Sequence, residues 1–382
     1  MRTLRLERIV TCRAGWDHGL GARSLRTGGT DDGGRRVTSP RVTLMDVAKR
    51  AGVSRTTASF VMTGRRDMRI SSDAEERVRK AARELNYRPS LLARSLRTNL
   101  SQTIGLLSDV IATEVFAGEM IRGSLSTARL RDHLMFIGET EGDPEVEKRL
   151  IQSMLDRGVG GFVYASMYTR RVALSKTLRA HPVVLLNCMA RLRGIPTVIP
   201  DEREAGRTAV RALLRQGHRD GIVLVGEKAP HVIAAAERLA GVEEVLAQQG
   251  TELADSIDTL WWPDSSYRAV RSYLDAGNQP SALICLNDRI AMGAYQAAQE
   301  AGLVIPEDLS VISFDDSDMA SWLQPQLSSV AIPHFELGRR AVEILLMDNR
   351  PTDIQRVPMP LRERGSIGPP AVRKRTRRAR AR

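Results

Sequence analysis

The sequence predicts two parts, a small all-α head of three helices and a larger α/β body built on parallel sheets. Apolar residues recur with helical spacing between capping signals over residues 43–85. From Ile104 to about Val330, short apolar runs alternate with amphipathic stretches. Residues 41–100 carry a net charge of +8, whereas residues 101–370 carry −7. Such a concentration of basic charge is typical of a nucleic-acid-binding segment, although a solvated charged surface is the alternative.

The two ends of the chain lack any pattern that would bury a core. Residues 1–40 are rich in Gly, Arg, Ser and Thr and are expected to be a disordered extension, either a flexible arm or a mis-assigned translation start. The basic tail, residues 371–382, is expected to be disordered and to add non-specific affinity for phosphate. Neither a signal peptide nor a membrane span is predicted, so a cytoplasmic protein is expected.

The sequence contains no motif that is typical of a metal site or of an enzyme. The three cysteines, Cys12, Cys188 and Cys285, are far apart, which favours buried free thiols over a disulfide framework or a zinc site. The nucleophile-elbow, zinc-protease, P-loop and dinucleotide-binding motifs are missing, and the six histidines are scattered. We therefore predict neither an enzyme nor a bound cofactor or metal.

The first two helices of the head are marked by caps and a tight turn. The run Thr43-Leu44-Met45-Asp46 is a capping-box pattern, which predicts a helix that starts at Leu44. Leu44 and its i+3 and i+4 neighbours form one apolar face, and Gly52 then permits the left-handed conformation of a turn. Ser54 is the expected cap of the second helix.

A third helix is predicted from Ser71 or Ser72 to Leu85, with an inward face made of Val78, Ala81, Ala82 and Leu85. Two short helices joined by a Gly-containing turn, inside a basic segment, match the helix-turn-helix motif. In that motif the second helix enters the major groove of DNA.

The body is predicted to contain seven strands with helices between them. Pro144 after Asp143 is a helix start, and Gly158 and Gly302 follow helical segments as stop signals. The expected strands are Ile104–Ser108, Leu134–Ile137, Gly161–Ala165, Val183–Asn187, Ile222–Val225, Ala282–Leu286 and Leu309–Ser313.

Several motifs resemble the lac repressor family in both order and spacing over residues 42–365. They are Val42 to Ala48, Ala51-Gly52-Val53-Ser54, Leu85-Asn86-Tyr87-Arg88-Pro89, Ala93 to Arg97, Thr103 to Leu106, and Ala282 to Asp316. The resemblance implies a helix-turn-helix head followed by a periplasmic-binding-protein-like body of two parallel-sheet subdomains joined by three crossovers. It also implies a DNA-binding transcription regulator.

The domain boundaries that follow from the resemblance are specific. Residues 41–88 are the expected DNA-binding domain, and 89–100 are the hinge helix and linker. Residues 101–370 are the expected effector-binding and dimerisation domain. Its subdomains are expected at about 101–199 plus 327–352, and at 200–326 plus 353–370.

The resemblance implies a repressor that binds a palindromic operator as a homodimer and responds to a sugar or nucleoside-like effector. Arg55 and Thr56 are the implied base readers, and Leu96 is the implied minor-groove wedge. The alternative is that Leu91, Leu92 and Leu96 belong to a linker and cover apolar surface. Phe60 stands where the family often has Arg, so it either contacts a base or packs in the head. The full set of expected DNA contacts is Thr43, Ser54, Arg55, Thr56, Thr57, Ser59, Phe60, Arg65, Tyr87, Ala93, Leu96 and Arg97.

The expected effector site gathers polar residues at strand ends, where α/β sheets bind ligands. Arg238, Asp288 and Trp261 are implied by resemblance, with a surface-helix position for Arg238 and an N-cap role for Asp288 as alternatives. Asp315 is the preferred ligand of the pair that it forms with Asp316. The full set is Asp109, Phe116, Asn187, Arg238, Trp261, Asp288 and Asp315.

Two other functions share part of this pattern. A periplasmic sugar-binding protein would have the fold of the body, but the basic head and the missing signal peptide argue against it. Alternatively, the body only dimerises the head or responds to a protein, and the polar strand ends argue weakly against that. The residues after Pro360 contain no heptad repeat of the kind that forms a tetramer, so a tetramer is not predicted.

Overall fold

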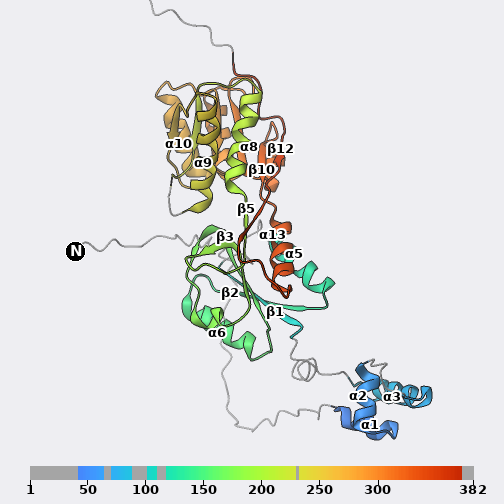
Figure 1. The fold of residues 1–382 in the computed structure, drawn as a ribbon. Helices are drawn as coiled ribbons and strands as arrows, with labels where there is room; N and C mark the ends of the chain where they lie inside the picture. Colours follow the sequence, from blue (N-terminus) through green and yellow to red (C-terminus); the bar gives the residue numbers. More distant parts are fainter. Residues whose placement is uncertain (1–41, 64–69, 88–100, 110–117, 229–231, 372–382) are drawn as a thin grey trace, which may run out of the picture. The chain divides into compact units, whose positions relative to one another are not determined.

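The structure is a computed structural model that describes residues 42–63, 70–87, 101–109, 118–228 and 232–371 (Figure 1). The chain divides into two compact units, one ending at Arg88 and the other beginning at Pro89. Five of the predicted site residues lie outside the described residues, as do residues 1–40 and 372–382. These five are Arg65, Ala93, Phe116, Leu96 and Arg97.

The head contains the three predicted helices. They are α1 (Leu44–Ala51), α2 (Arg55–Thr63) and α3 (Ser72–Glu84), and Ser71 is the N-cap of α3. One apolar cluster holds them together, made of Val47, Ala48, Ala51, Ala58, Val61, Val78, Ala81 and Ala82. An ion pair of 2.9 Å between Arg50 and Glu84 also links α1 to α3. The predicted apolar faces of α1 and α3 are confirmed, although Leu44 and Leu85 are only partly buried and the α2 residues of the cluster were not predicted.

The first sheet of the body is wholly parallel, in the order β11-β5-β4-β3-β1-β2. Its strands are β1 (Thr103–Ser108), β2 (Leu134–Glu139), β3 (Phe162–Val172), β4 (Val183–Ala190), β5 (Thr197–Pro200) and β11 (Ile354–Val357). Alternate side chains of β1 enter different cores, with Leu106 on one face and Leu107 on the other. Helices α5 (Gly118–Leu130) and α13 (His334–Leu345) cover the Leu106 face. Helices α6 (Pro144–Leu155) and α7 (Lys176–Arg179) cover the other.

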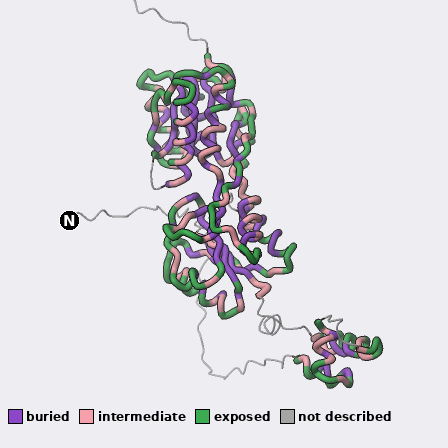
Figure 2. The backbone as a smooth tube through the Cα atoms, in the orientation of Figure 1, coloured by how far each residue is buried: buried purple, intermediate pink, exposed green. Residues whose placement is uncertain are grey.

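The second sheet has the order β12-β10-β9-β8-β6-β7, and only the β10–β12 pair within it is antiparallel. Its strands are β6 (Ile222–Val225), β7 (Asp255–Ile257), β8 (Ala282–Cys285), β9 (Ser310–Asp315), β10 (Ser328–Ala331) and β12 (Leu361–Arg362). The helices with it are α8 (Glu202–Arg215), α9 (Ile233–Gln248), α10 (Pro263–Asp275), α11 (Asp288–Glu300) and α12 (Asp318–Trp322). Strands β6 and β8 are continuous apolar runs and are buried on both faces, as is typical of parallel strands covered by helices (Figure 2).

Two predicted subdomain boundaries differ from the sheet pairing. Residues 327–352 were expected in the first subdomain, but β10 pairs with β9 of the second sheet. Residues 353–370 were expected in the second subdomain, but β11 pairs with β5 of the first sheet. The chain therefore crosses from the second sheet to the first after Ala331 and returns after Val357. Short strands such as β10, which contains two serines, have no apolar period that would have located these crossings.

Several helices of the body cross in direct contact at glycines, among them α5 with α13 and α8 with α9. A Cβ atom on Gly123 of α5 would lie 2.0 Å from the carbonyl oxygen of Phe335, and one on Gly338 of α13 would lie 2.0 Å from that of Met120. The α8–α9 pair has the same arrangement, because a Cβ on Gly206 would lie 2.0 Å from the carbonyl oxygen of Arg238. Only glycine permits such close backbone approach.

Candidate functional site

The start of α1 is fixed by the predicted capping box. The backbone N–H of Thr43 donates to a carboxylate oxygen of Asp46 over 2.8 Å, and the Thr43 hydroxyl donates to the same oxygen over 2.7 Å. These two bonds lower the pKa of Asp46. The side chain of Thr43 is therefore part of the cap, and any contact with DNA would add to that role.

The turn between α1 and α2 presents the N-terminus of α2. Gly52 adopts the left-handed conformation, with φ of 66°. The hydroxyl of Ser54 accepts the backbone N–H of Thr57 over 3.0 Å and lies 2.8 Å from the Thr57 hydroxyl. Ser54 and Thr57 thus order the first turn of α2, whose unpaired backbone N–H groups attract phosphate.

Helix α2 has one buried and one exposed face. Ala58 and Val61 are buried in the head, whereas Arg55 and Thr56 are exposed at the first turn. Ser59 and Phe60 are half-buried, and the Thr63 hydroxyl donates to the carbonyl oxygen of Ser59 over 2.7 Å. An exposed guanidinium and hydroxyl at the start of this helix suit hydrogen bonding to base edges in a major groove.

Tyr87 is partly buried against the apolar cluster of the head, and its backbone N–H donates to the carbonyl oxygen of Ala82 over 2.9 Å. Asn86, which follows the C-cap of α3, has the left-handed conformation, with φ of 51°. Tyr87 therefore anchors the chain where it leaves the head.

If the first turn of α2 reads base edges, as the sequence predicts, Arg55→Ala should weaken binding to a specific DNA site by roughly 10- to 100-fold, because each bidentate Arg–guanine contact contributes about 1–3 kcal/mol. Binding to a random duplex should change little. The measurement is a fluorescence anisotropy titration with both duplexes at one salt concentration. Arg79→Ala removes a similar exposed charge, which pairs with Glu75 on α3, and serves as the control. Equal loss with both duplexes would contradict the base-reading role of Arg55.

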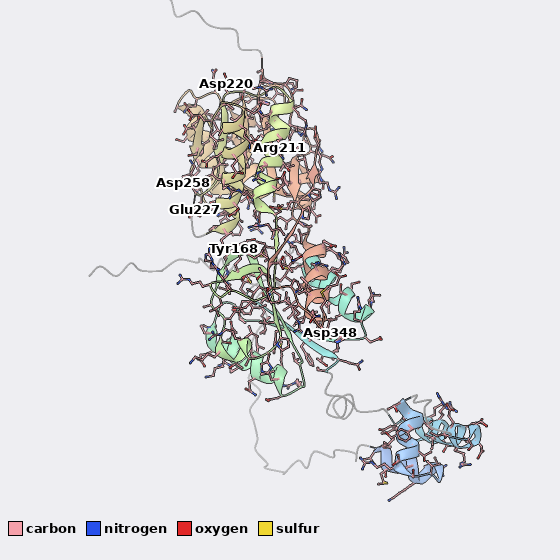
Figure 3. All side chains as sticks on the ribbon, in the orientation of Figure 1. Tyr168, Arg211, Asp220, Glu227, Asp258 and Asp348 are labelled. Atoms are coloured by element: carbon pink, nitrogen blue, oxygen red, sulfur yellow. The ribbon has the colours of Figure 1, made fainter. Side chains whose placement is uncertain are left out.

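In the body, Figure 3 shows in which direction the strands of the second sheet run. Asp220, just before β6, lies at one end of this part of the body, whereas Glu227 and Asp258, which follow β6 and β7, lie at the other. The carboxyl ends of the parallel strands thus gather at the Glu227 end. Ligands of open α/β sheets bind at such ends.

At the carboxyl end of the first sheet, Asp109 and Asn187 hold an irregular segment of β3. The β3–β4 register shifts between Ala165 and Arg170. Asp109 accepts the backbone N–H of Met167 over 3.1 Å and pairs with the Arg170 guanidinium over 3.0 Å.

The amide of Asn187 completes the support of this segment. It donates to the carbonyl oxygens of Ser166 and Met167 over 3.0 Å each and accepts the Thr169 hydroxyl over 2.8 Å. Asn187 has φ of 54°, a strained conformation for a residue other than glycine. Both predicted effector residues of this sheet therefore already support its backbone.

Arg238 lies at the centre of the polar groups of the second sheet. Its side chain is 3% exposed, which excludes the surface-helix alternative. Its Nε donates to Oε2 of Glu202 over 2.7 Å, and its Nη1 donates to the carbonyl oxygen of Leu286. Its guanidinium carbon also lies 4.6 Å from the centre of the Phe314 ring. The partner Glu202 could not be predicted from the sequence, because an acidic residue in the first turn of an amphipathic helix is usually exposed.

Asp315 lies beside Arg238 in a strained backbone conformation. Its Oδ1 is 3.8 Å from Nη2 of Arg238, longer than a hydrogen bond, and its φ is 109°. Burial raises the pKa of Asp315 well above its usual range, and the Arg238 guanidinium opposes that rise. Asp316, in contrast, is bound by Arg364 over 2.6 Å, which fits the preference for Asp315 as the ligand.

Both carboxylate oxygens of Asp288 accept hydrogen bonds from serines. Its Oδ1 accepts the hydroxyls of Ser313 and Ser329, and its Oδ2 accepts the backbone N–H and the hydroxyl of Ser317 over 2.7 and 2.8 Å. The N-cap of α11 is Asn287, which accepts the backbone N–H of Ile290 over 2.8 Å, so the N-cap alternative for Asp288 is wrong. Burial raises the pKa of Asp288, and its serine bonds lower it. Asp288 thus joins the starts of α11 and α12 to β9 and β10.

Trp261 is partly buried against the apolar core around the second sheet, and its indole N–H donates to Glu227 over 3.3 Å. This contact places an aromatic ring beside the end of β6. The next residue, Trp262, is exposed and lies 4.5 Å from the Arg289 guanidinium carbon.

Within the residues that the structure describes, no cluster of three or more His, Cys, Asp or Glu side chains is arranged to hold a metal ion. No helix in the same part of the chain is long and apolar enough to cross a membrane.

Two family models match the chain. Residues 43–90 match the model "Bacterial regulatory proteins, lacI family", and residues 197–367 match a periplasmic binding protein-like domain. The first match covers the head, and the second match covers most of the body. The two matches thus agree with the two parts of the fold.

Characterised relatives match most of the chain. It is 33% identical to the HTH-type transcriptional regulator AscG of Escherichia coli (strain K12), over 80% of this chain and 91% of the relative. It is 32% identical to the Ribose operon repressor of Haemophilus influenzae, with the same coverage. These relatives are transcriptional regulators by name.

Solved structures share the fold. A lac repressor dimer bound to operator and the anti-inducer ONPF matches with a TM-score of 0.71 at 25% identity, over 86% of this chain and 99% of that one. A LacI family regulator from Enterococcus faecium with bound ribose matches with a TM-score of 0.57 at 26% identity, over 70% of this chain and 99% of that one.

Proposed function

Because the chain belongs to the lacI family of bacterial regulatory proteins, we propose that it is a repressor whose operator affinity is controlled by a small effector. It binds a palindromic operator as a homodimer, and its body binds a sugar or nucleoside-like molecule. The observation that carries this proposal is that one chain contains both features: exposed Arg55 and Thr56 on α2, and in the body a buried Arg238 beside a strained Asp315.

The relatives support a sugar more directly than another class of effector. One is named for the ribose operon, and one structural neighbour contains ribose. The lac repressor structure is a dimer on its operator, and a two-fold protein matches a palindromic site. In this chain, Trp261 would pack against the apolar face of a sugar ring, and Asp315 would accept a bond from a hydroxyl group.

The effector acts by shifting a population of conformations. Arg238 on α9 contacts Leu286 after β8 and Asp315 at the end of β9, so a ligand there bridges several elements of the second sheet. The chain crosses between the two sheets after Ala331, next to Asp315 in the sheet register. A ligand that binds one arrangement of these crossings more tightly increases the population of that arrangement. The change in the body then alters how the head binds DNA.

The coupling runs through the hinge segment at residues 89–96, where Leu96 inserts between base pairs at the operator centre. We expect Leu96→Ala to weaken operator binding at least about tenfold, because alanine is too short to wedge a base step apart, while affinity for a random duplex stays nearly unchanged. Titrations of both duplexes at fixed salt measure this. Leu91→Ala, in the same segment, is the control, and equal losses on both duplexes would refute the wedge.

The effector is tested by thermal shift of the full chain against sugars and nucleosides. A ligand at 100 times its Kd stabilises the native state by about 2.7 kcal/mol. We expect at least one sugar to raise the melting temperature and to change operator affinity. If no compound does both, the proposed effector control is wrong.

A further inference from the structure

His334 begins α13 immediately after the chain leaves the second sheet. Its backbone N–H donates to the carbonyl oxygen of Ile332 over 2.8 Å, and the backbone N–H of Ile332 donates to the carbonyl oxygen of Asp315 over 3.2 Å. Ile332 packs against both main cores of the body. His334 therefore stands at the crossing between the two sheets, two residues from a direct backbone contact with Asp315.

The imidazole of His334 has an unused hydrogen-bonding atom. Its Nδ1 is buried and has no hydrogen-bond partner among the described residues, where only three other side-chain atoms share that condition. Burial, and then the nearby Arg238 guanidinium, lower the pKa of His334 to about 4. At neutral pH the ring is uncharged, so it offers one donor and one acceptor nitrogen.

Arg238 and Asp315 also retain bonding capacity next to it. Two nitrogens of Arg238 are used by Glu202 and Leu286, but its Nη2 is 3.8 Å from Asp315, beyond hydrogen-bond distance. A single hydroxyl group placed between them satisfies both, because it donates to a carboxylate and accepts from a guanidinium at once.

The charges around this cluster disfavour an anion. Two guanidinium groups act on Asp315, those of Arg238 and Arg289, and they face three carboxylates, those of Glu202, Asp288 and Asp315 itself. Since His334 is neutral, the cluster has no net positive charge, even if Asp315 is protonated. A phosphate or carboxylate group would thus lose its hydration without gaining a compensating charge.

We propose that His334 is a specificity-determining residue of the effector site, whose imidazole hydrogen-bonds a hydroxyl group of an uncharged polyhydroxy effector bound at Arg238 and Asp315. This inference rests on the proposed function, since it requires that the body bind an effector at this place. An unpaired buried polar atom destabilises the state that contains it, so an effector hydroxyl that pairs with it favours the bound arrangement of the crossing.

The test compares His334→Phe, which keeps a planar ring without nitrogens, with His334→Asn, which keeps a polar group near the position of Nδ1. The full-length chain is titrated by calorimetry with ribose, glucose and galactose, their monodeoxy derivatives and phosphates, and adenosine. His133→Phe, at an exposed turn where Nδ1 contacts the carbonyl of Arg131, is the control. Melting curves and operator binding show that each variant is folded.

We expect the wild type to bind an uncharged sugar and to bind one monodeoxy derivative at least about tenfold more weakly. His334→Phe should lose that discrimination, and His334→Asn should retain most of it. Unchanged discrimination in folded His334→Phe overturns the role of His334 but leaves effector binding intact. A preference of the wild type for the sugar phosphates overturns the proposed ligand class. Failure of the wild type to bind any compound contradicts effector binding itself, and with it this inference.

Discussion

Arg238→Ala is expected to lower the free energy of unfolding by about 3–5 kcal/mol, because it leaves the buried Glu202 carboxylate without its partner. Both side chains are only 3% exposed, so water cannot replace the lost bond. The same change should abolish the effector response, since Arg238 adjoins Asp315. Chemical denaturation measures the first effect, and operator titration with and without effector measures the second.

The double variant Arg238→Met with Glu202→Gln separates these two effects. It removes both buried charges and keeps similar side-chain volumes, a replacement that is often neutral for stability. We expect it to recover most of the lost stability and none of the effector response. A double variant that still responds to effector would show that Arg238 has only a structural role. An Arg238→Ala variant as stable as the wild type would show that the ion pair is not buried in solution.

Gly123→Ala is expected to destabilise the body by about 3 kcal/mol or more, because its Cβ would lie 2.0 Å from the backbone carbonyl oxygen of Phe335 on α13. A backbone atom cannot move aside as the end of a flexible side chain can, so α5 and α13 must separate. Thermal and chemical denaturation of the full chain measure the effect.

Gly118→Ala is the matched control in the same helix. In the part of the chain that the structure describes, no atom lies within 4 Å of a Cβ placed on Gly118. Alanine there should be neutral or slightly stabilising, because it reduces the freedom of the unfolded chain. If the two variants had equal stability, the close crossing of α5 and α13 would be wrong.

The sequence predicted the elements whose signals are local. Thr43 and Asp46 form the capping box that their spacing indicated, and Asp143 caps the helix that begins at Pro144. The run Ile222–Val225 is a buried parallel strand, as its continuous apolar character indicated. Each of these features depends on residues within a few positions of one another, so one sequence is enough to find them.

The details of the candidate site depend on distant contacts and were missed. Glu202 and His334 have no local feature that separates them from exposed residues at the start of a helix, and only the fold brings each of them near Arg238. Asp288 was correctly placed at a strand end, but its oxygens are taken by serines 25 to 41 positions away in the chain. Sequence spacing located the polar groups and left undetermined which of them remain open to a ligand.

The central claim is that one chain couples a DNA-reading head to an effector-binding body. Its most direct test is a titration of the full-length chain with an operator selected from random duplexes, at fixed salt, with and without a sugar that raises its melting temperature. We predict that the sugar changes operator affinity at least about tenfold, equivalent to about 1.4 kcal/mol of coupling, and leaves random-duplex affinity unchanged. A sugar that binds the body while operator affinity stays constant would contradict the account.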